Sequence, residues 1–171
     1  MSEARSWGLV NGVLAVVLVL LVAGAVVLGV SGAGQSPQEA SAAAMSQEYD
    51  AVTAAARRET EAFLTVDYRN MAPTVKKVLA GATGAFKKEY ARSEVNLRTA
   101  AHQSRASSKG TVRAVGIGDI GPSSATVYVA ADSTVSNKST GHKPQPRYYR
   151  FQLTMTRVKG TWLTSDLQFV S

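Results

Sequence analysis

The sequence YRFQLTMTRVKGTWLTSDLQF occupies residues 149–169 and alternates between apolar and polar side chains. Alternation with a period of two is typical of a β-strand that buries one face and leaves the other in water. Residues 158–161 interrupt the pattern, and Gly160 allows the positive φ that a tight hairpin turn requires. The sequence therefore predicts a hairpin with strands at 149–156 and 162–169. In the second strand, Leu163, Leu167 and Phe169 are expected on one side and Asp166 on the other.

Two more strands and a polar loop precede this hairpin. Residues 125–131 alternate in the same way, and residues 111–117 form a weaker strand that ends at the Gly-rich stretch 118–122. Residues 136–147 contain one Gly and two Pro but no hydrophobic position. We expect this segment to be an exposed, mobile loop. The C-terminal part of the chain is thus predicted to form four antiparallel strands.

Helical patterns dominate the part of the chain before these strands. Residues 38–66 are rich in Ala, Glu and Gln, and Ser36 or Ser41 is a candidate for capping the start of a helix. Apolar side chains recur in this segment with a helical period, and the stripe weakens where Glu59 or Thr60 takes its place. The members of the stripe are Met45, Tyr49, Val52, Ala56, Phe63 and Val66.

A short helix at 74–79 and a second long helix at 84–104 follow a break at residues 67–70. Helices followed by antiparallel strands predict an α+β fold. The apolar face of the sheet must be covered, and the two long helices are the cover that the sequence offers. A curved four-stranded sheet around these helices would form a cone. The apolar stripe of the second long helix consists of Phe86, Tyr90, Leu97 and Ala101.

The N-terminal segment has the composition of a membrane anchor. Residues 13–30 are drawn only from Val, Leu, Ala and Gly, and about 20 such residues span the hydrocarbon core of a bilayer. We predict a cytoplasmic tail at 1–8, a transmembrane helix at 9–30, a linker at 31–37 and an extracytoplasmic domain at 38–171, in which 38–50 is a candidate stalk. Arg5 on the N-terminal flank favours this orientation in the plasma membrane.

A cleaved signal peptide is the alternative to this anchor. The small residues 31–33 provide a cleavage pattern, but the apolar run is longer than the roughly 7–15 residues of a signal peptide. The sequence leaves open whether the N-terminal segment is removed.

Composition excludes several classes of site. The chain has no cysteine and two histidines, so we expect no disulfide, no metal site and no cofactor. The net charge of +7 is the sum of +10 in residues 67–171 and −3 in residues 31–66, and the basic residues are not interleaved with aromatic ones. We therefore expect no nucleic-acid partner.

The order of these segments resembles a known family. A single anchor, an Ala-rich helix, the segment TGAFKKEY at 83–90 and a strand-rich end with KGTWL at 159–163 are similar to the actinobacterial Mce-associated membrane proteins. Mce stands for mammalian cell entry. The Gly-x-Trp turn at 160–162 is shared with cone-shaped domains of the nuclear-transport-factor-like superfamily.

This resemblance implies an accessory subunit that stabilises an Mce-type lipid-import complex. The expected partners are Mce permease and substrate-binding subunits or related accessory proteins, at the membrane and as a homo- or hetero-oligomer. Two alternatives share the same anatomy: an inner-membrane scaffold of a type IV secretion or conjugation apparatus, and a protein that holds a lipid in the cone. The family brings no catalytic residues with it, and we do not expect an enzyme.

The candidate residues fall into three groups according to their expected role. Those that we expect to be structural are Gly84, Phe86, Tyr90, Gly160 and Trp162. A surface for an acidic partner or a lipid head group is predicted at Arg147, Arg150 and Arg157, with a solvated face as the alternative. Residues considered for chemistry, but more typical of helix ends, turns and wet faces, are His102, Asp119, Asp132 and Asp166.

Overall fold

The computed structural model describes residues 36–170. The described elements are α2 (Pro37–Leu64), β1 (Val66–Asp67), α3 (Ala72–Gly81), α4 (Gly84–Ser104), β2 (Ser107–Ile120), β3 (Ser124–Ser136), β4 (Gln145–Val158) and β5 (Thr161–Phe169). The chain divides into two compact units between Ala44 and Met45, and the sheet, α3 and α4 belong to the unit from Met45 onward.

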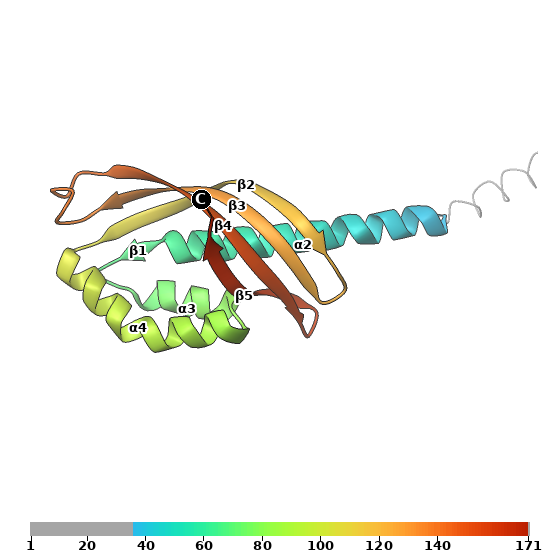
Figure 1. Ribbon diagram of the computed structural model, residues 1–171, viewed down its shortest axis with the longest axis horizontal. Coiled ribbons are helices and arrows are strands. Elements are labelled where there is room, and N and C mark those ends of the chain that lie inside the picture. Colours follow the sequence, from blue (N-terminus) through green and yellow to red (C-terminus); the bar gives the residue numbers. More distant parts are fainter. Residues whose placement is uncertain (1–35, 171) are drawn as a thin grey trace, which may run out of the picture. The chain divides into compact units, whose positions relative to one another are not determined.

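The fold is α+β, as predicted, with a sheet of five strands instead of four. The strands follow one another in the order β1-β2-β3-β4-β5, and every neighbouring pair is antiparallel. The additional strand, β1, has two residues, which are too few to show any periodicity in the sequence. Figure 1 shows the sheet as a curved layer with α3 and α4 on one side of it.

Helix bounds agree with the sequence pattern. The α4 helix begins at Gly84 and ends at Ser104, as predicted, while α2 ends two residues earlier than expected. Ser36 caps α2: its hydroxyl accepts the Glu39 amide at 3.2 Å, and the Glu39 carboxylate accepts the Ser36 amide at 2.9 Å. This reciprocal arrangement is a capping box.

The main core lies between α2 and the inner face of the sheet. In α2 the buried stretch begins at Val52, whereas Met45 and Tyr49 are exposed. The predicted stripe therefore packs only in its second half. The fully buried apolar side chains of the sheet come from alternate positions of β3 and β4: Val127, Phe151, Leu153 and Met155.

The β4–β5 hairpin has the predicted turn. Lys159 and Gly160 both have positive φ, at 50° and 83°, which is the requirement of a type I′ turn. One detail of β5 differs from the prediction. Thr164 pairs with Met155 and Asp166 with Thr154, so Ser165 is an extra residue in the strand. This bulge places Leu163 on the face opposite Leu167, whereas strict alternation put them together.

Side chains and a neighbouring segment occupy positions on both edges of the sheet. On β2, Val112 donates its amide to Glu61 at 3.2 Å and accepts Arg57 at 2.9 Å on its carbonyl. On β5, Thr83 donates its amide to the Thr164 carbonyl at 2.8 Å. The helical layer is thus joined to the sheet by backbone as well as by apolar contacts.

The predicted transmembrane segment at 9–30 lies outside the described residues. Among residues 36–170, every helix is too short or too polar to cross a bilayer.

Candidate functional site

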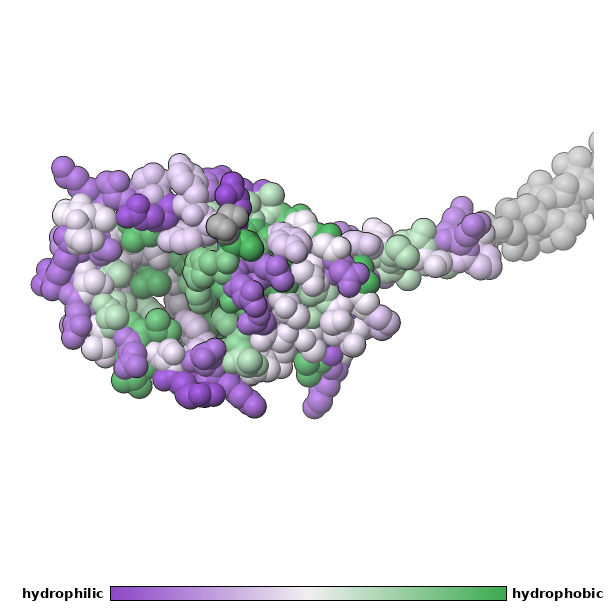
Figure 2. Space-filling model, in the orientation of Figure 1, coloured by the Kyte–Doolittle hydropathy of each residue, from purple (hydrophilic) through white to green (hydrophobic). Residues whose placement is uncertain are grey.

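An apolar cavity of about 540 Å³ lies beside α4 in the unit from Met45 onward. We call it the aromatic cavity. Figure 2 shows a recess bordered by hydrophobic residues in this part of the surface. The lining comes from α2, β1, α4 and the segments after β1 and α4: Phe63, Val66, Met71, Phe86, Glu89, Tyr90, Ser93, Leu97, Ala100, Ala101, Ser104 and Ala106.

Helix α4 supplies the long wall of this cavity. All four residues of its predicted apolar stripe line the cavity. Tyr90 and Ala101 are buried, Phe86 is half-buried and Leu97 is 38% exposed. The stripe that we expected to be covered by the core is therefore only partly covered, and the remainder faces an open space.

Aromatic rings connect this wall to the sheet. Phe63 of α2 lies 6.1 Å from Phe86 and 6.2 Å from Phe151, measured between ring centroids. Phe151 in turn lies 5.0 Å from Phe169 and 5.8 Å from Tyr149. These distances fall in the range of favourable aromatic pairs. A continuous aromatic layer thus runs from α4 through α2 to β4 and β5.

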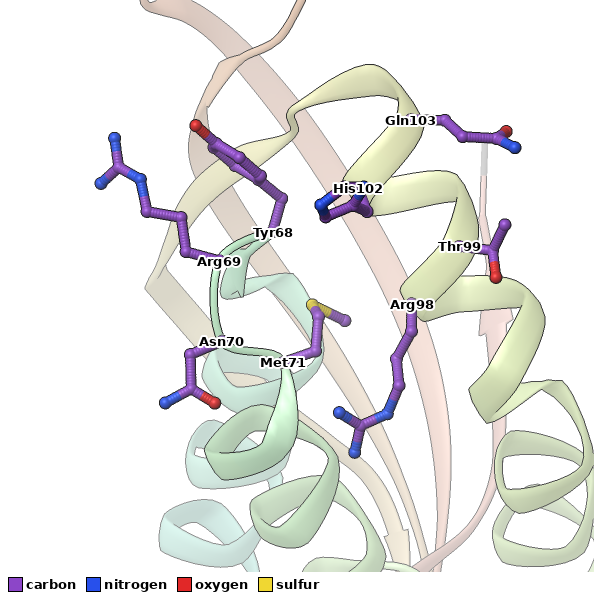
Figure 3. Close-up of a pocket in the computed structure, with 8 residues that line it drawn as sticks. All are labelled: Tyr68, Arg69, Asn70, Met71, Arg98, Thr99, His102 and Gln103. Atoms are coloured by element: carbon purple, nitrogen blue, oxygen red, sulfur yellow. The ribbon is translucent and has the colours of Figure 1, made fainter.

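A second recess of about 490 Å³ lies beside the last turns of α4. We call it the arginine hollow. Its lining is Tyr68, Arg69, Asn70, Met71, Arg98, Thr99, His102 and Gln103. Met71 also lines the aromatic cavity, so the two spaces adjoin. In Figure 3, Arg98 and His102 extend from α4 toward the segment that carries Met71, whereas Arg69 points away.

Two contacts hold the side chains of the arginine hollow in place. Arg98 donates from Nε and Nη2 to one oxygen of Glu94, at 3.0 and 2.7 Å. His102 packs edge-on against Tyr68, with 6.4 Å between the ring centroids. The prediction that His102 stands at the end of the helix is confirmed, since it lies in the last turn of α4.

A buried carboxyl group lies close to the aromatic cavity. Glu59 is 3% exposed, and its Oε1 has no hydrogen-bond partner among the described residues. Its Oε2 occupies the space that a Cβ on Gly81 would need. Burial raises the pKa of Glu59 from 4.5 to about 8. The pKa of Tyr90, a cavity residue, is raised by its own burial and then by the charge of Glu59.

Sequence reasoning did not single out Glu59 as a candidate. The available signal was its place in the apolar stripe of α2, three residues after Ala56 and four before Phe63. A carboxylate at a position where a helix turns its apolar side to the core is a candidate for a perturbed pKa.

The three predicted surface arginines do not form one cluster. Arg150 pairs with Ala130 on the outer face of the sheet. Arg147 and Arg157 lie at inner-face positions toward the two ends of β4, because side chains alternate along a strand. Arg157 contacts Glu48 at 3.0 Å and lies over the Trp162 ring. A role for these residues in binding a partner or head group stays a prediction.

The residues expected to be structural lie in the core or in turns. Gly84 has a φ of 56° at the start of α4, and Gly160 lies in the hairpin turn. Phe86 and Tyr90 lie one helical turn apart, with 6.1 Å between their rings. Trp162 is buried and donates from Nε1 to Glu48 at 2.7 Å.

The aspartates considered for chemistry are spread over the sheet. Asp132 was expected beside a turn, but β3 continues to Ser136, and Asp132 forms an ion pair with Arg113 at 2.6 Å. Asp119 is exposed near the end of β2. Asp166 accepts a hydrogen bond from Gln168 at 2.7 Å.

Several solved structures have a similar fold. The VirB8 protein of Agrobacterium tumefaciens has a TM-score of 0.57 at 11% identity, covering 72% of this chain and 92% of that one. An IcmL-like type IV secretion system protein of Legionella pneumophila has a TM-score of 0.56 at 13% identity, covering 69% and 88%. The periplasmic domain of DotI has a TM-score of 0.55 at 15% identity, covering 81% and 98%. These likenesses support the nuclear-transport-factor-like fold.

Sequence comparison gives a mycobacterial relative and a family. The relative is described as uncharacterized protein Rv1363c of Mycobacterium tuberculosis, and it is 30% identical over 124 residues. The matched region is 72% of this chain and 47% of the relative, so the chain spans about half of that protein. The more specific resemblance to Mce-associated proteins stays a prediction. A family model described as "Uncharacterized protein Rv1363c/MT1408-like" matches residues 10–171, and the chain therefore belongs to that family.

Proposed function

We propose that this chain is an assembly subunit of a multiprotein complex in the cell envelope and acts through protein–protein contacts. Its fold resembles domains described as type IV secretion system or periplasmic proteins. A shared fold does not by itself carry a shared function. The observation that carries the proposal is a surface on the outer face of the sheet.

This outer-face patch consists of Tyr128, Tyr148 and Arg150. Tyr128 is 47% exposed and Tyr148 is 77% exposed. Tyr148 pairs with Asp132, and Arg150 with Ala130, so all three patch residues point away from the inner core positions of β3 and β4. The two rings and the guanidinium of Arg150 therefore present both apolar area and hydrogen-bonding groups on the outer face of the sheet.

The residue types in the patch are those that dominate protein–protein binding energy. Tyr and Arg are enriched among the residues whose truncation weakens an interface most. Two glycines of the neighbouring strand leave room beside the first tyrosine: Gly116 pairs with Tyr128, and the ring lies across Gly118. A partner side chain can approach the backbone of β2 at Gly116, where a Cβ would meet no neighbour within 4 Å.

Two complexes are candidates for the partner. The secretion-type neighbours favour a scaffold of a type IV secretion or conjugation apparatus. The segment at 83–90 supports the second candidate, an accessory subunit of an Mce-type lipid-import complex. Both candidates require the anchor at 9–30 and a domain outside the cytoplasmic membrane, and both use the same kind of contact.

The experiment compares partners recovered from native membranes. Membranes that contain the full chain with a C-terminal tag are crosslinked and extracted in mild detergent, and captured proteins are identified by mass spectrometry. With the wild type we expect secretion-channel components. With Tyr148→Ala/Arg150→Ala their recovery should fall about thirtyfold or more, since hot-spot truncations cost about 2 kcal/mol or more.

Lys77→Ala is the control, because it also removes one exposed positive charge, but on α3 and not on the sheet. Its partner recovery should equal that of the wild type. Recovery of Mce permease or substrate-binding subunits would replace the secretion-type candidate by the second one. Equal recovery with the double variant and the wild type would refute the role of the patch.

A further inference from the structure

We infer that the aromatic cavity and the arginine hollow together bind an anionic single-chain lipid, with its acyl chain in the cavity and its head group in the hollow. The two spaces adjoin at Met71, which lines both. This binding does not depend on the assembly role proposed above, because it uses α4 and not the outer face of the sheet.

The lining of the aromatic cavity suits an acyl chain. Phe63, Phe86 and Leu97 are among the apolar side chains in its wall, and its volume of about 540 Å³ lies within the range of about 300–1,000 Å³ typical of small-molecule sites. Its wall follows α4 from Phe86 to Ser104. At a rise of 1.5 Å per residue, this stretch is about 27 Å long, which fits an elongated ligand better than a compact one.

The apolar surface of α4 is exposed as it stands. Leu97 is 38% exposed although it belongs to the apolar stripe, and Phe86 is only half-buried. Contiguous apolar surface of this kind marks a binding site for an apolar group. An acyl chain along α4 would cover the stripe that the fold leaves open.

The arginine hollow provides the charge that selects the head group. Arg98 and His102 extend from α4 into the space beside Met71 (Figure 3). Glu94 holds the guanidinium through Nε and Nη2. Among residues 36–170 the third nitrogen, Nη1, has no hydrogen-bond partner, so it can donate to a carboxylate or phosphate, with His102 one helical turn farther along. Arg98 lines the arginine hollow and its neighbour Leu97 lines the aromatic cavity. The head group and the acyl chain of one lipid would therefore join at this turn of α4.

Photo-crosslinking tests the proposal on the full chain in its membrane. The probe is palmitate with a diazirine in the middle of the acyl chain, and labelled peptides are mapped by mass spectrometry. We expect the label on the cavity-facing residues of α4, in the peptide that contains Leu97 and Ala100. Labels distributed without preference over the helices of the domain would overturn the acyl-chain site.

A cavity-filling variant separates binding from general lipid contact. Ala100→Trp places a large side chain in the cavity and should reduce labelling of α4 at least about fivefold. Val95→Trp is the control, because Val95 is 71% exposed on the same helix and does not line the cavity. Equal labelling of the two variants would contradict the site, and circular dichroism spectra that match the wild type establish that both variants fold.

The head group is tested by comparing palmitate with the neutral diazirine derivative of hexadecanol. The wild type should prefer palmitate about fivefold or more, since a charge-assisted hydrogen bond distinguishes the two probes. Arg98→Gln should remove this preference, while Arg92→Gln, a change of the same type at an exposed position of α4, should keep it. Equal labelling of the wild type by both probes would overturn the head-group assignment.

Discussion

The carboxyl group of Glu59 couples the interior of this protein to pH. It is buried next to Gly81, and burial raises its pKa to about 8. A buried carboxyl without a partner is more stable with its proton on. The folded chain therefore holds this proton over a pH range in which the unfolded chain has already released it.

Wild type and Glu59→Gln should differ in how stability depends on pH. Between pH 4.5 and about 8 the unfolded wild type releases the proton first, so its free energy of unfolding falls as the pH rises through this window. The loss from this group is on the order of 5 kcal/mol, since each pKa unit corresponds to about 1.4 kcal/mol. Below the window the contribution is fully present, and above it the contribution is gone. Gln cannot titrate, so the variant lacks this slope.

Thermal unfolding followed by circular dichroism at about pH 5 and about pH 8 measures the difference. The melting temperature of Glu59→Gln relative to that of the wild type should rise from the lower to the higher pH. Parallel pH profiles of the two proteins would show that the buried carboxyl does not set the slope.

The position of Glu59 was visible in the sequence, but its burial was not. The stripe of α2 shows a carboxylate where an apolar residue is expected. The depth of burial depends on Gly81 and Tyr90, which belong to α3 and α4. A local pattern cannot report which elements will cover a given turn of a helix.

At the level of elements, period-two alternation predicted the long strands because one face of the sheet is wet. It missed β1, and it extended through Ser165 although a bulge there reverses the faces. The alternation also predicted a start of β2 at residue 111, whereas the strand begins at Ser107, since residues 107–110 are polar or Gly and show no alternation. A strand can be recognised from the sequence where apolar and polar side chains alternate between its two faces. Its ends and bulges depend on the strand with which it pairs.

The contact between α2 and β2 gives a prediction at this scale. Arg57→Ala/Glu61→Ala removes both side chains that bind the backbone of Val112. We expect a loss of about 1–3 kcal/mol, because two backbone groups lose their partners. Hydrogen exchange of the peptide that contains Val112 should accelerate relative to peptides of β4. Arg58→Ala, at the exposed neighbouring position, serves as the control, and unchanged exchange in the double variant would contradict the prediction.

Across the whole unit from Met45 onward, the carboxylate of Glu48 joins α2 to the β4–β5 hairpin. The same oxygen accepts Trp162 Nε1 at 2.7 Å and contacts Arg157 at 3.0 Å. The partners are 114 residues apart in the chain, so the contact joins α2 to the last strand, β5.

The predicted cone follows from the sequence, because the apolar face of the sheet needs helices to cover it. The aromatic cavity could not be predicted from the sequence. The apolar stripe of α4 has the same sequence pattern whether it packs against a neighbouring element or lines an open space.

Substitutions at Glu48 should separate its two contacts. Glu48→Ala loses both and is expected to lower the free energy of unfolding by about 1–2 kcal/mol. Glu48→Gln keeps an acceptor for Trp162 and loses only the partly exposed ion pair, which is worth about 1 kcal/mol or less. Denaturant unfolding followed by tryptophan fluorescence measures both, and equal losses would show that the hydrogen bond to Trp162 contributes little.

The occupied edges of the sheet have a consequence for self-association. An exposed strand edge is a template on which further chains can add and grow into fibrils. Here the amide and carbonyl of Val112 are taken by α2, and the carbonyl of Thr164 is taken by Thr83. A strand that approached either edge would find its ladder interrupted at these points. Edge-to-edge association with another chain is thereby hindered at these two positions.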